Sequence, residues 1–229
     1  EEEIRRSDRI CITGLPRTGK TIFCRYLARM FEPRILIIDP LNQYEMFPEE
    51  CRYVPRQETA MELEMIAKQL HARGNITLII EEAEQYLGQN RPILPYTSAL
   101  IRMGRNWGIG IYATTRRIQD IHKRFFDLAQ HVFFFRCGFK SREYIADMIG
   151  WEYMYPVANP KYNKTRYSIT TLPPYHCLHF NLETETAQII TLKLKPYGAA
   201  IGQIQEIGKR SEAGKDTAKE KPPQELPPK

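Results

Sequence analysis

The chain has 229 residues, of which 42% are hydrophobic and 26% are charged. This length fits one domain, and the composition supplies a core and excludes wholesale disorder. The longest strongly apolar runs span about four residues, far fewer than the roughly 20 that cross a bilayer. We therefore expect no membrane segment, and the first residues show no secretory signal.

Positive charge is concentrated in one part of the chain. The formal net charge is +6, yet residues 102–142 hold nine Arg or Lys against two Asp. This distribution is typical of a surface for a polyanion or a phosphate, although solvated helix faces also produce it. The five cysteines are scattered and form no C-x-x-C pair, which argues against disulfides and zinc and favours the cytoplasm.

Short apolar runs alternate with longer amphipathic ones, which predicts α/β units around a mostly parallel sheet. Strands are expected at residues 9–13, 34–38, 76–80, 108–113 and 132–135. Helices are expected at residues 20–31, 58–72, 96–105, 118–128 and 141–149.

The character of the chain changes after residue 150. A segment rich in Tyr, Asn and Pro leads to two strand-like runs, 175–182 and 187–194, which predict a β-hairpin at a sheet edge. Residues 208–229 contain almost nothing apolar and are expected to be disordered. We therefore expect one domain over residues 1–207, with its core at 9–150.

A phosphate-binding motif lies between the first expected strand and helix. GLPRTGKT, residues 14–21, matches G-x-x-x-x-G-K-[ST]. Here backbone amides face the β- and γ-phosphates, Lys20 adds a charge and Thr21 offers its hydroxyl to Mg²⁺, so we expect ATP and Mg²⁺ as cofactors. The expected nucleotide contacts are Gly14, Pro16, Arg17, Thr18, Gly19, Lys20, Thr21 and Ile22.

Two acids follow the buried strand expected at residues 76–80. Glu81 is suited to hold the Mg²⁺ hydration shell, and Glu82 to orient and deprotonate an attacking water. A second carboxylate favours hydrolysis over kinase chemistry. The alternative is that Glu82 and Glu84 only begin a solvated helix.

The strand expected at residues 108–113 ends in Thr114 and Thr115, polar residues that can sense the γ-phosphate at the same edge. Three arginines flank this strand, and an arginine that reaches a neighbour's γ-phosphate accelerates hydrolysis strongly. From the residues alone, Arg105, Arg116 and Arg117 remain equal candidates.

These segments resemble the FtsK-HerA superfamily of ring-forming, DNA-pumping P-loop ATPases, which includes viral genome-packaging ATPases. The likeness covers about residues 10–150 and rests on GLPRTGKT, ILIIDPLNQY, LIIEEAEQYL and GRNWGIGIYATTRRIQDIHKRFFDLAQHVFFFRC. Glu81 stands where the family usually has Asp, and Thr115 where a phosphate-sensing Gln is usual. Gln119 is close in sequence to that position but falls past the end of the expected strand.

The resemblance implies an ASCE-type sheet in which the sensor strand lies between the P-loop strand and the acid strand. It also implies a homo-oligomeric ring, most often a hexamer, in which Arg105 serves the neighbouring subunit. The implied catalytic set is Lys20, Glu82, Arg105 and Thr115.

We interpret the chain as an ATP-hydrolysing motor that packages double-stranded viral DNA into a capsid, in the host cytoplasm or on the virion. Arg91, Lys123 and Arg124 are the expected DNA contacts, because a translocating ring grips phosphates without reading sequence. A capsid or portal vertex is a further possible partner. Alternatives are an ATPase for filamentous-virion assembly, conjugation or secretion, and a nucleotide switch or small-molecule kinase that does not bind DNA.

Overall fold

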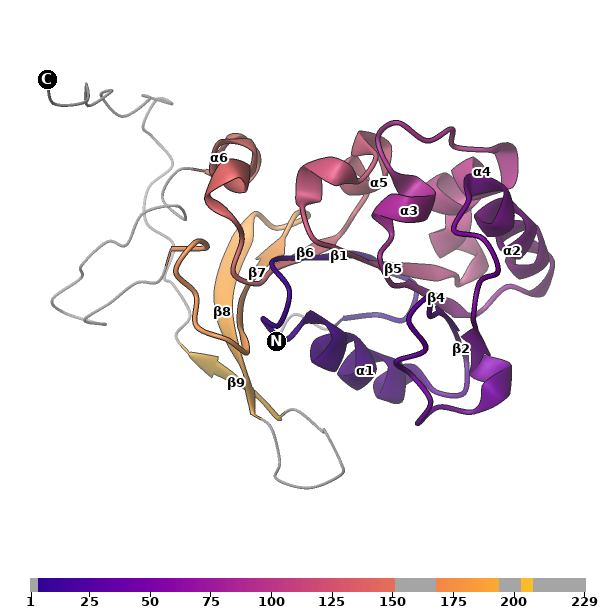
Figure 1. Cartoon of the computed structure of the whole chain (residues 1–229), viewed down its shortest axis with the longest axis horizontal. Helices are drawn as coiled ribbons and strands as arrows, with labels where there is room; N and C mark the ends of the chain where they lie inside the picture. The colour runs from indigo at the N-terminus through magenta and orange to yellow at the C-terminus, as the bar shows by residue number, and fades with distance from the viewer. Residues whose placement is uncertain (1–3, 151–167, 194–202, 208–229) are drawn as a thin grey trace, which may run out of the picture.

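The apolar runs of the sequence form one twisted sheet with helices on both faces (Figure 1). The computed structural model describes residues 4–150 and 168–193, and the backbone of 203–207. The expected Tyr-rich segment lies mostly outside the described residues, and the expected disordered tail does so entirely.

Nine strands of the described residues pair in the order β3-β2-β4-β5-β1-β6-β7-β8-β9. The first six in this order are parallel, and β7, β8 and β9 continue the sheet antiparallel to β6 and to one another. The strands are β1 (Arg9–Thr13), β2 (Ile35–Ile38), β3 (Arg52–Tyr53), β4 (Thr77–Ile80), β5 (Gly110–Thr115), β6 (His131–Phe134), β7 (His176–Asn181), β8 (Thr186–Lys193) and β9 (Gln203–Ile207).

The helices divide unevenly between the two faces of the sheet. Helix α1 packs on one face, and the others cover the opposite face (Figure 1). The helices are α1 (Lys20–Phe31), α2 (Ala60–Arg73), α3 (Glu84–Leu87), α4 (Pro95–Met103), α5 (Lys123–Asp127) and α6 (Arg142–Ile149).

Strand order and register bring the polar strand ends together. Strand β5 lies between β1 and β4, as the resemblance implies. Ile80, the last residue of β4, pairs with Ala113, while Thr13 at the end of β1 pairs with Thr115. Strand β5 therefore extends two residues past β4, and Thr114 lies beside the first residue that follows β4.

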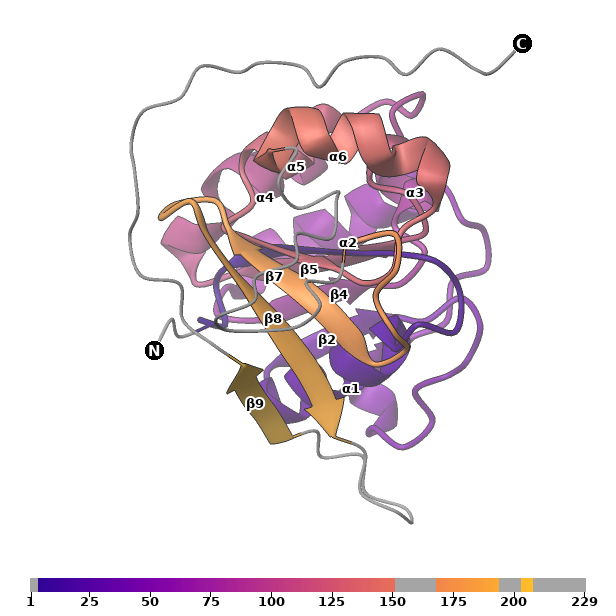
Figure 2. The same cartoon turned by 90° about the vertical axis from the view of Figure 1, so that its left-hand side faces the viewer.

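The predicted hairpin is confirmed as β7 and β8, and β9 adds a third antiparallel strand that the sequence pattern does not predict (Figure 2). A short turn joins β7 to β8, as is possible for antiparallel neighbours, whereas parallel neighbours need a crossover connection. No helix in the described ranges is long and apolar enough to cross a membrane.

The predicted boundaries are wrong around β5. The strand begins at Gly110 rather than residue 108 and ends at Thr115 rather than residue 113. Gly108 has a positive φ of 67° and ends a 3-10 turn over Gly104–Trp107, which also replaces the last residues of the helix expected at 96–105. Turns closed by backbone hydrogen bonds have no hydrophobic period that would reveal them in the sequence.

Three further elements differ from expectation, one because it contains a 3-10 turn and two because they are very short. The helix expected at residues 118–128 is a 3-10 turn, Ile118–Asp120, followed by α5. Strand β3 is only two residues long and was not predicted. Helix α3 is a single turn, and the sequence indicated it only through the alternative in which Glu82 and Glu84 begin a helix; it begins at Glu84.

The core of the α1 face is built from aromatic side chains. Phe23 of α1 lies with its ring centroid 4.6 Å from that of Phe133 in β6, and both side chains are fully buried. Phe133 also stacks on the imidazole of His179 in β7, which joins the parallel strands to the antiparallel ones.

We expect Phe133→Ala to lower the free energy of unfolding by about 3–5 kcal/mol, because it leaves a cavity between α1 and the sheet. Urea unfolding followed by circular dichroism measures this. The control is Phe139→Ala, at a residue that is 69% exposed and whose ring contacts only the guanidinium of Arg142 among the described cation–ring pairs; it should change stability by no more than about 1 kcal/mol. Equal losses in both variants would contradict this assignment of the core.

Candidate nucleotide-binding site

A cavity of about 570 Å³ lies at the edge of the sheet where the parallel strands end. It is bordered by the loop after β1, the segment after β2 and the ends of β4 and β5. Among the residues expected from the sequence, it is lined by Pro16, Arg17, Gly19, Lys20, Thr21, Ile22, Glu81, Glu82 and Thr115.

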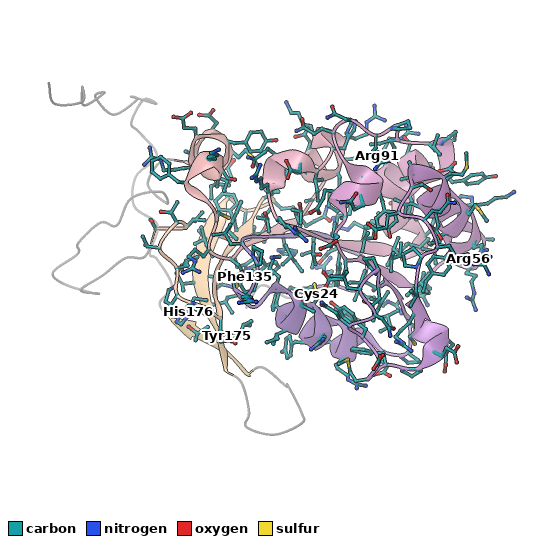
Figure 3. The ribbon with its side chains drawn as sticks, viewed as in Figure 1. Cys24, Arg56, Arg91, Phe135, Tyr175 and His176 are labelled. Atoms are coloured by element: carbon teal, nitrogen blue, oxygen red, sulfur yellow. The ribbon has the colours of Figure 1, made fainter. Side chains whose placement is uncertain are left out.

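The glycine-rich loop requires its glycines. Gly14 and Gly19 have φ angles of 146° and 117°, which residues with a Cβ rarely adopt. A Cβ on Gly14 would lie 2.7 Å from the Cβ of Phe135, and one on Gly19 would lie 3.1 Å from the ring of Tyr175 (Figure 3). The loop is thus packed closely against β6 and against the chain that enters β7.

Gly14 and Thr18 shape this loop from within and do not line the cavity. The Gly14 N–H donates to the carbonyl oxygen of Thr115 at 3.3 Å, and the Leu15 N–H donates to that of Arg136 at 2.8 Å. The hydroxyl of Thr18, which is buried, donates to the Leu15 carbonyl at 2.8 Å. These bonds tie the loop to the strands on both sides of β1.

The ammonium group of Lys20 lies across the loop. Its Nζ donates to the carbonyl oxygens of Gly14 at 2.7 Å and Leu15 at 3.0 Å. An ammonium has three N–H donors, so one remains for a phosphate oxygen. Burial lowers the pKa of Lys20, and the nearby charge of Glu81 opposes that shift.

The carboxylate of Glu81 is buried and held on two sides. It accepts a hydrogen bond from the hydroxyl of Tyr44 on one oxygen and from Thr114 Oγ1, at 2.6 Å, on the other. Burial raises the pKa of Glu81, while these two hydrogen bonds and the charge of Lys20 act in the opposite direction.

These donors and acceptors fit Mg²⁺ bound together with a nucleotide. Mg²⁺ prefers oxygen ligands and is usually held by one or two carboxylates with substrate phosphates and water. Glu81 retains acceptor lone pairs beyond its two hydrogen bonds, and Thr21 on the first turn of α1 lines the same cavity. The backbone amides of Arg17–Thr21 suit the phosphates themselves.

Glu82 has a different environment. Its φ of 50° is in the left-handed region, which a non-glycine residue enters at an energetic cost that is common at functional sites. Its N–H donates to Thr114 Oγ1 at 3.1 Å, and its carboxylate pairs with Arg116 at 2.7 Å. Helix α3 begins only at Glu84, so Glu82 precedes the helix and lines the cavity.

Asp39 and Tyr44 are site residues that the sequence pattern did not single out. Asp39, buried at the end of β2, accepts hydrogen bonds at 2.8 Å from the N–H groups of Gln43 and Tyr44. This cap turns the loop so that the phenol of Tyr44 reaches Glu81. An acid directly after a buried strand was a usable signal, but the role of Tyr44 depends on tertiary contact.

Glu84 and Tyr175 were also missed. Glu84 lines the cavity. Its Oε2 is buried without a hydrogen-bond partner, and burial raises the pKa of the Glu84 carboxyl group. Tyr175, from the chain that enters β7, donates its N–H to the Thr18 carbonyl at 2.8 Å. No local pattern distinguishes either residue from its neighbours.

Of the three candidate arginines, only Arg116 lines this cavity. Arg105 precedes β5 and so lies at the far end of that strand from Thr115, about 20 Å away for six residues of strand. It forms an ion pair of 2.8 Å with Glu183 in the turn between β7 and β8. Arg105 therefore lies outside the nucleotide cavity of its own subunit.

The residues expected to contact DNA also lie away from this cavity. Arg91 is exposed in the segment after α3, and Lys123 and Arg124 begin α5, where both are exposed. Thr115 is buried, and its hydroxyl donates to the Arg117 carbonyl at 3.0 Å.

This sheet order, loop and acid strand define the class of protein: the P-loop ATPase fold with a mostly parallel sheet and antiparallel strands at one edge. Solved structures agree. The genome-packaging NTPase B204 of Sulfolobus turreted icosahedral virus 2, in complex with ATP-gammaS, matches with a TM-score of 0.66 and 19% identity, over 81% of this chain and 98% of that one.

Two proteins from other systems share the fold. The cytoplasmic domain of the type VII secretion ATPase EccC of Thermomonospora curvata matches at a TM-score of 0.58 and 13% identity, over 81% of this chain and 24% of that one. The N-terminal domain of zonular occludens toxin from Neisseria meningitidis matches at 0.50 and 13%, over 82% and 95%. No protein-family model and no curated protein matches the sequence. At the level of the fold, the resemblance seen in the sequence is confirmed.

We expect Tyr44→Phe to weaken Mg²⁺-dependent nucleotide binding by about tenfold, because a buried carboxylate loses one of its two donors. The pKa of Glu81 should rise further, and metal binding needs the ionised form. Affinity should therefore begin to fall at a higher pH than in the wild type as the solution is acidified. Titration with a fluorescent ATP analogue across pH measures both effects.

The matched control is Tyr53→Phe. The Tyr53 hydroxyl donates to Glu62 at 2.5 Å, outside the cavity, so its loss should leave nucleotide binding unchanged. A pH profile of Tyr44→Phe identical to that of the wild type would show that this hydrogen bond does not support Glu81.

Proposed function

We propose that this chain hydrolyses ATP and uses the energy to move double-stranded DNA into a viral capsid. The observation that carries the proposal is the meeting of a P-loop and two consecutive acids in one cavity, on a fold shared with a viral genome-packaging NTPase. ATP analogues occupy that related protein, and we infer ATP with Mg²⁺ as the ligands here.

In this proposal the P-loop amides and Lys20 hold the phosphates, while Thr21 and Glu81 hold the metal ion. A metal ion held by these two residues would supply positive charge to offset the negative charge of the phosphates during hydrolysis. Glu82 receives the proton of the attacking water, with Arg116 orienting its carboxylate. The buried hydroxyl of Thr115 lies next to the P-loop, because β5 pairs with β1, and is suited to respond to the γ-phosphate.

The position of Arg105 supports a ring. Arg105 lies beyond the opposite end of β5 from the nucleotide cavity of its own subunit and cannot act there, but the same group on a neighbouring subunit can approach that cavity from outside. We propose a homo-oligomeric ring, six-membered in the manner of the family, in which each site is completed by Arg105 of the next subunit.

Double-stranded DNA is the proposed substrate because positive charge gathers on segments that leave the nucleotide site. Arg91 follows the acid strand, and Lys123 and Arg124 follow the sensor strand. Phosphate contacts of this kind hold a polyanion without reading its sequence. A capsid or portal vertex is the partner we infer for such a motor, which would work in the host cytoplasm or on the virion.

A second candidate function is assembly or secretion at a membrane. The match to the type VII secretion ATPase EccC favours it, since the two proteins share the fold. The packaging motor is preferred because B204 matches at a higher TM-score and over nearly its whole length. A nucleotide switch or small-molecule kinase predicts a monomer whose turnover ignores DNA.

We expect Glu82→Gln to bind ATP with nearly wild-type affinity but to hydrolyse it at least about 10² times more slowly, because the amide cannot accept the proton from water. Steady-state phosphate release and ATP-analogue titration separate the two effects. Glu50→Gln, at an exposed position after β2, is the control and should retain full turnover. Rapid hydrolysis by Glu82→Gln would exclude Glu82 as the base.

We expect Arg105→Ala to lower turnover per subunit by about 10³ in the assembled state, because the transition state loses an arginine supplied in trans. Mixing Arg105→Ala with Lys20→Ala subunits should restore activity, since the intact P-loop of one then meets the intact Arg105 of the other. The rate is measured by phosphate release at subunit ratios from zero to one.

Glu183→Ala is the matched control for this experiment. It removes the same exposed ion pair but keeps the guanidinium, so it should cost little stability and leave turnover intact. If the mixture of Arg105→Ala and Lys20→Ala were as inactive as its components, Arg105 would not act across a subunit boundary.

A further inference from the structure

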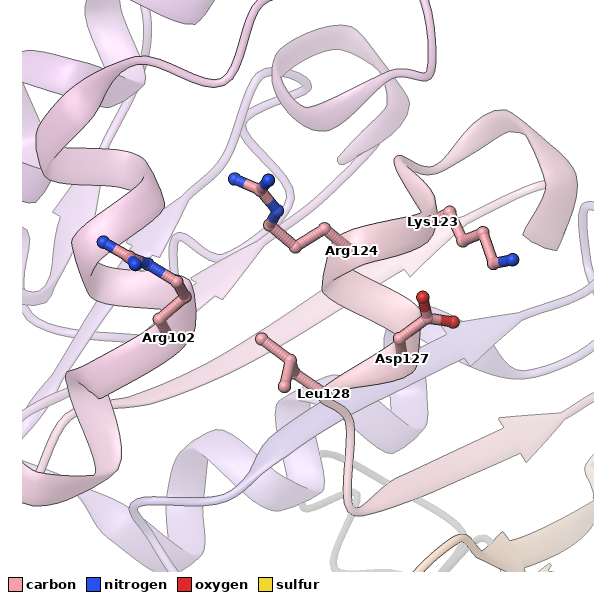
Figure 4. Close-up of a pocket in the computed structure, with 5 residues that line it drawn as sticks. All are labelled: Arg102, Lys123, Arg124, Asp127 and Leu128. Atoms are coloured by element: carbon pink, nitrogen blue, oxygen red, sulfur yellow. The ribbon is translucent and has the colours of Figure 1, made fainter.

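A second cavity, of about 610 Å³, opens between α4 and α5 (Figure 4). Its wall contains three cationic side chains and one carboxylate. The lining residues are Arg102, Lys123, Arg124, Asp127 and Leu128. Three positive charges against one negative leave this small surface strongly cationic. Arg102 was not among the DNA contacts expected from the sequence.

Buried Arg9, the first residue of β1, ties together the two helix ends that border this cavity. Its Nε donates to the Leu128 carbonyl at 2.6 Å, and its Nη1 donates to the Ile101 carbonyl at 3.0 Å. Both acceptors are backbone carbonyls, so we assign Arg9 mainly the role of fixing the distance between α4 and α5.

The arginines come from both helices. Arg124 reaches from α5 toward α4, where its Nη1 donates to the hydroxyl of Ser98 at 3.3 Å, while Lys123 points the other way, on the side of Asp127 (Figure 4). Arg102 belongs to the last turn of α4. Guanidinium groups are planar forks that match phosphate oxygens in pairs, which suits two of them for one phosphodiester.

We propose that this cavity seats a phosphate of the DNA backbone, with Arg102 and Arg124 as its principal ligands. The inference rests on the proposed function and names the binding surface for its substrate.

Backbone hydrogen bonds connect the cavity to the nucleotide site. The segments that leave β4 and β5 are joined by a bridge between Gly88 and Ile121, and the His122 N–H donates to the Leu87 carbonyl at 2.7 Å. Helix α5 begins at the next residue, Lys123. A shift of the strand ends during hydrolysis would therefore reach α5 through two short segments.

The test is the binding of a short fluorescein-labelled duplex to the full chain, followed by anisotropy over a range of salt concentrations. We expect the double variant Arg102→Ala, Arg124→Ala to bind roughly tenfold more weakly at low salt. Its slope of log affinity against log salt should become shallower by about 0.9 for each phosphate that the variant no longer neutralises. ATPase activity without DNA should be unchanged, since neither residue lines the nucleotide cavity.

The charge-matched control is Arg56→Ala, Arg73→Ala. Both arginines are exposed and lie outside the cavity, Arg56 beside α2 (Figure 3). This variant should bind the duplex as the wild type does. An equal loss in both double variants would show that only overall charge matters and would overturn the assignment.

Asp127→Asn tests the proposal in the opposite direction. It removes the only carboxylate of the lining, at an exposed position, and should tighten duplex binding about twofold to threefold with a steeper salt slope. General damage to the fold cannot produce tighter binding. Unchanged or weaker binding by this variant would contradict the proposal.

The outcomes separate this inference from the proposed function. If the wild type binds the duplex and Arg102→Ala, Arg124→Ala binds equally well, the motor remains but the cavity is not its DNA contact. If the wild type neither binds the duplex nor hydrolyses ATP faster in its presence, both the cavity assignment and the DNA motor are wrong.

Discussion

The buried carboxylate of Glu81 is the constraint on which the rest of the site depends. A carboxylate removed from water needs donors, and here they come from separate elements: Tyr44 after β2 and Thr114 in β5. Asp39 in turn folds the loop that delivers Tyr44. The hydrogen bonds that the Glu81 carboxylate accepts thus hold the ends of β2, β4 and β5 in place relative to one another and to the P-loop beside them.

The polarity of the parallel strands separates the molecule into two functional edges. The P-loop and the acids collect where the strands end, because all six parallel strands point the same way. Arg105 and the cationic cavity between α4 and α5 lie toward the edge where strands begin, as the hydrogen bonds of Arg9 indicate. The chain therefore carries the nucleotide-binding residues at one edge of the sheet and Arg105 with the cationic cavity toward the other. This arrangement suits the ring that we propose.

Much of the fold was predictable because its strands are short, apolar and fully buried. The runs at Arg9–Thr13 and Thr77–Ile80 bury every residue, and their β-branched character was sufficient to locate them. The bounds of β5 were not predictable. Backbone hydrogen bonds define the 3-10 turn that precedes Gly108, and such a turn produces no hydrophobic period in the sequence. Helix α3 is one turn long and leaves no periodic signal at all.

The sequence by itself determined the fold class and the nucleotide motif, since glycine spacing, Lys20, Thr21 and the paired acids are local chemistry that any strand-loop-helix unit will present at one edge. Tertiary structure decided which other side chains join them. Tyr44 and Tyr175 approach the P-loop region from distant segments, and Arg102 and Arg124 line one cavity from two different helices. These contacts depend on the packing of the helices against the sheet and on the order of the strands, and the spacing of neighbouring residues predicts neither.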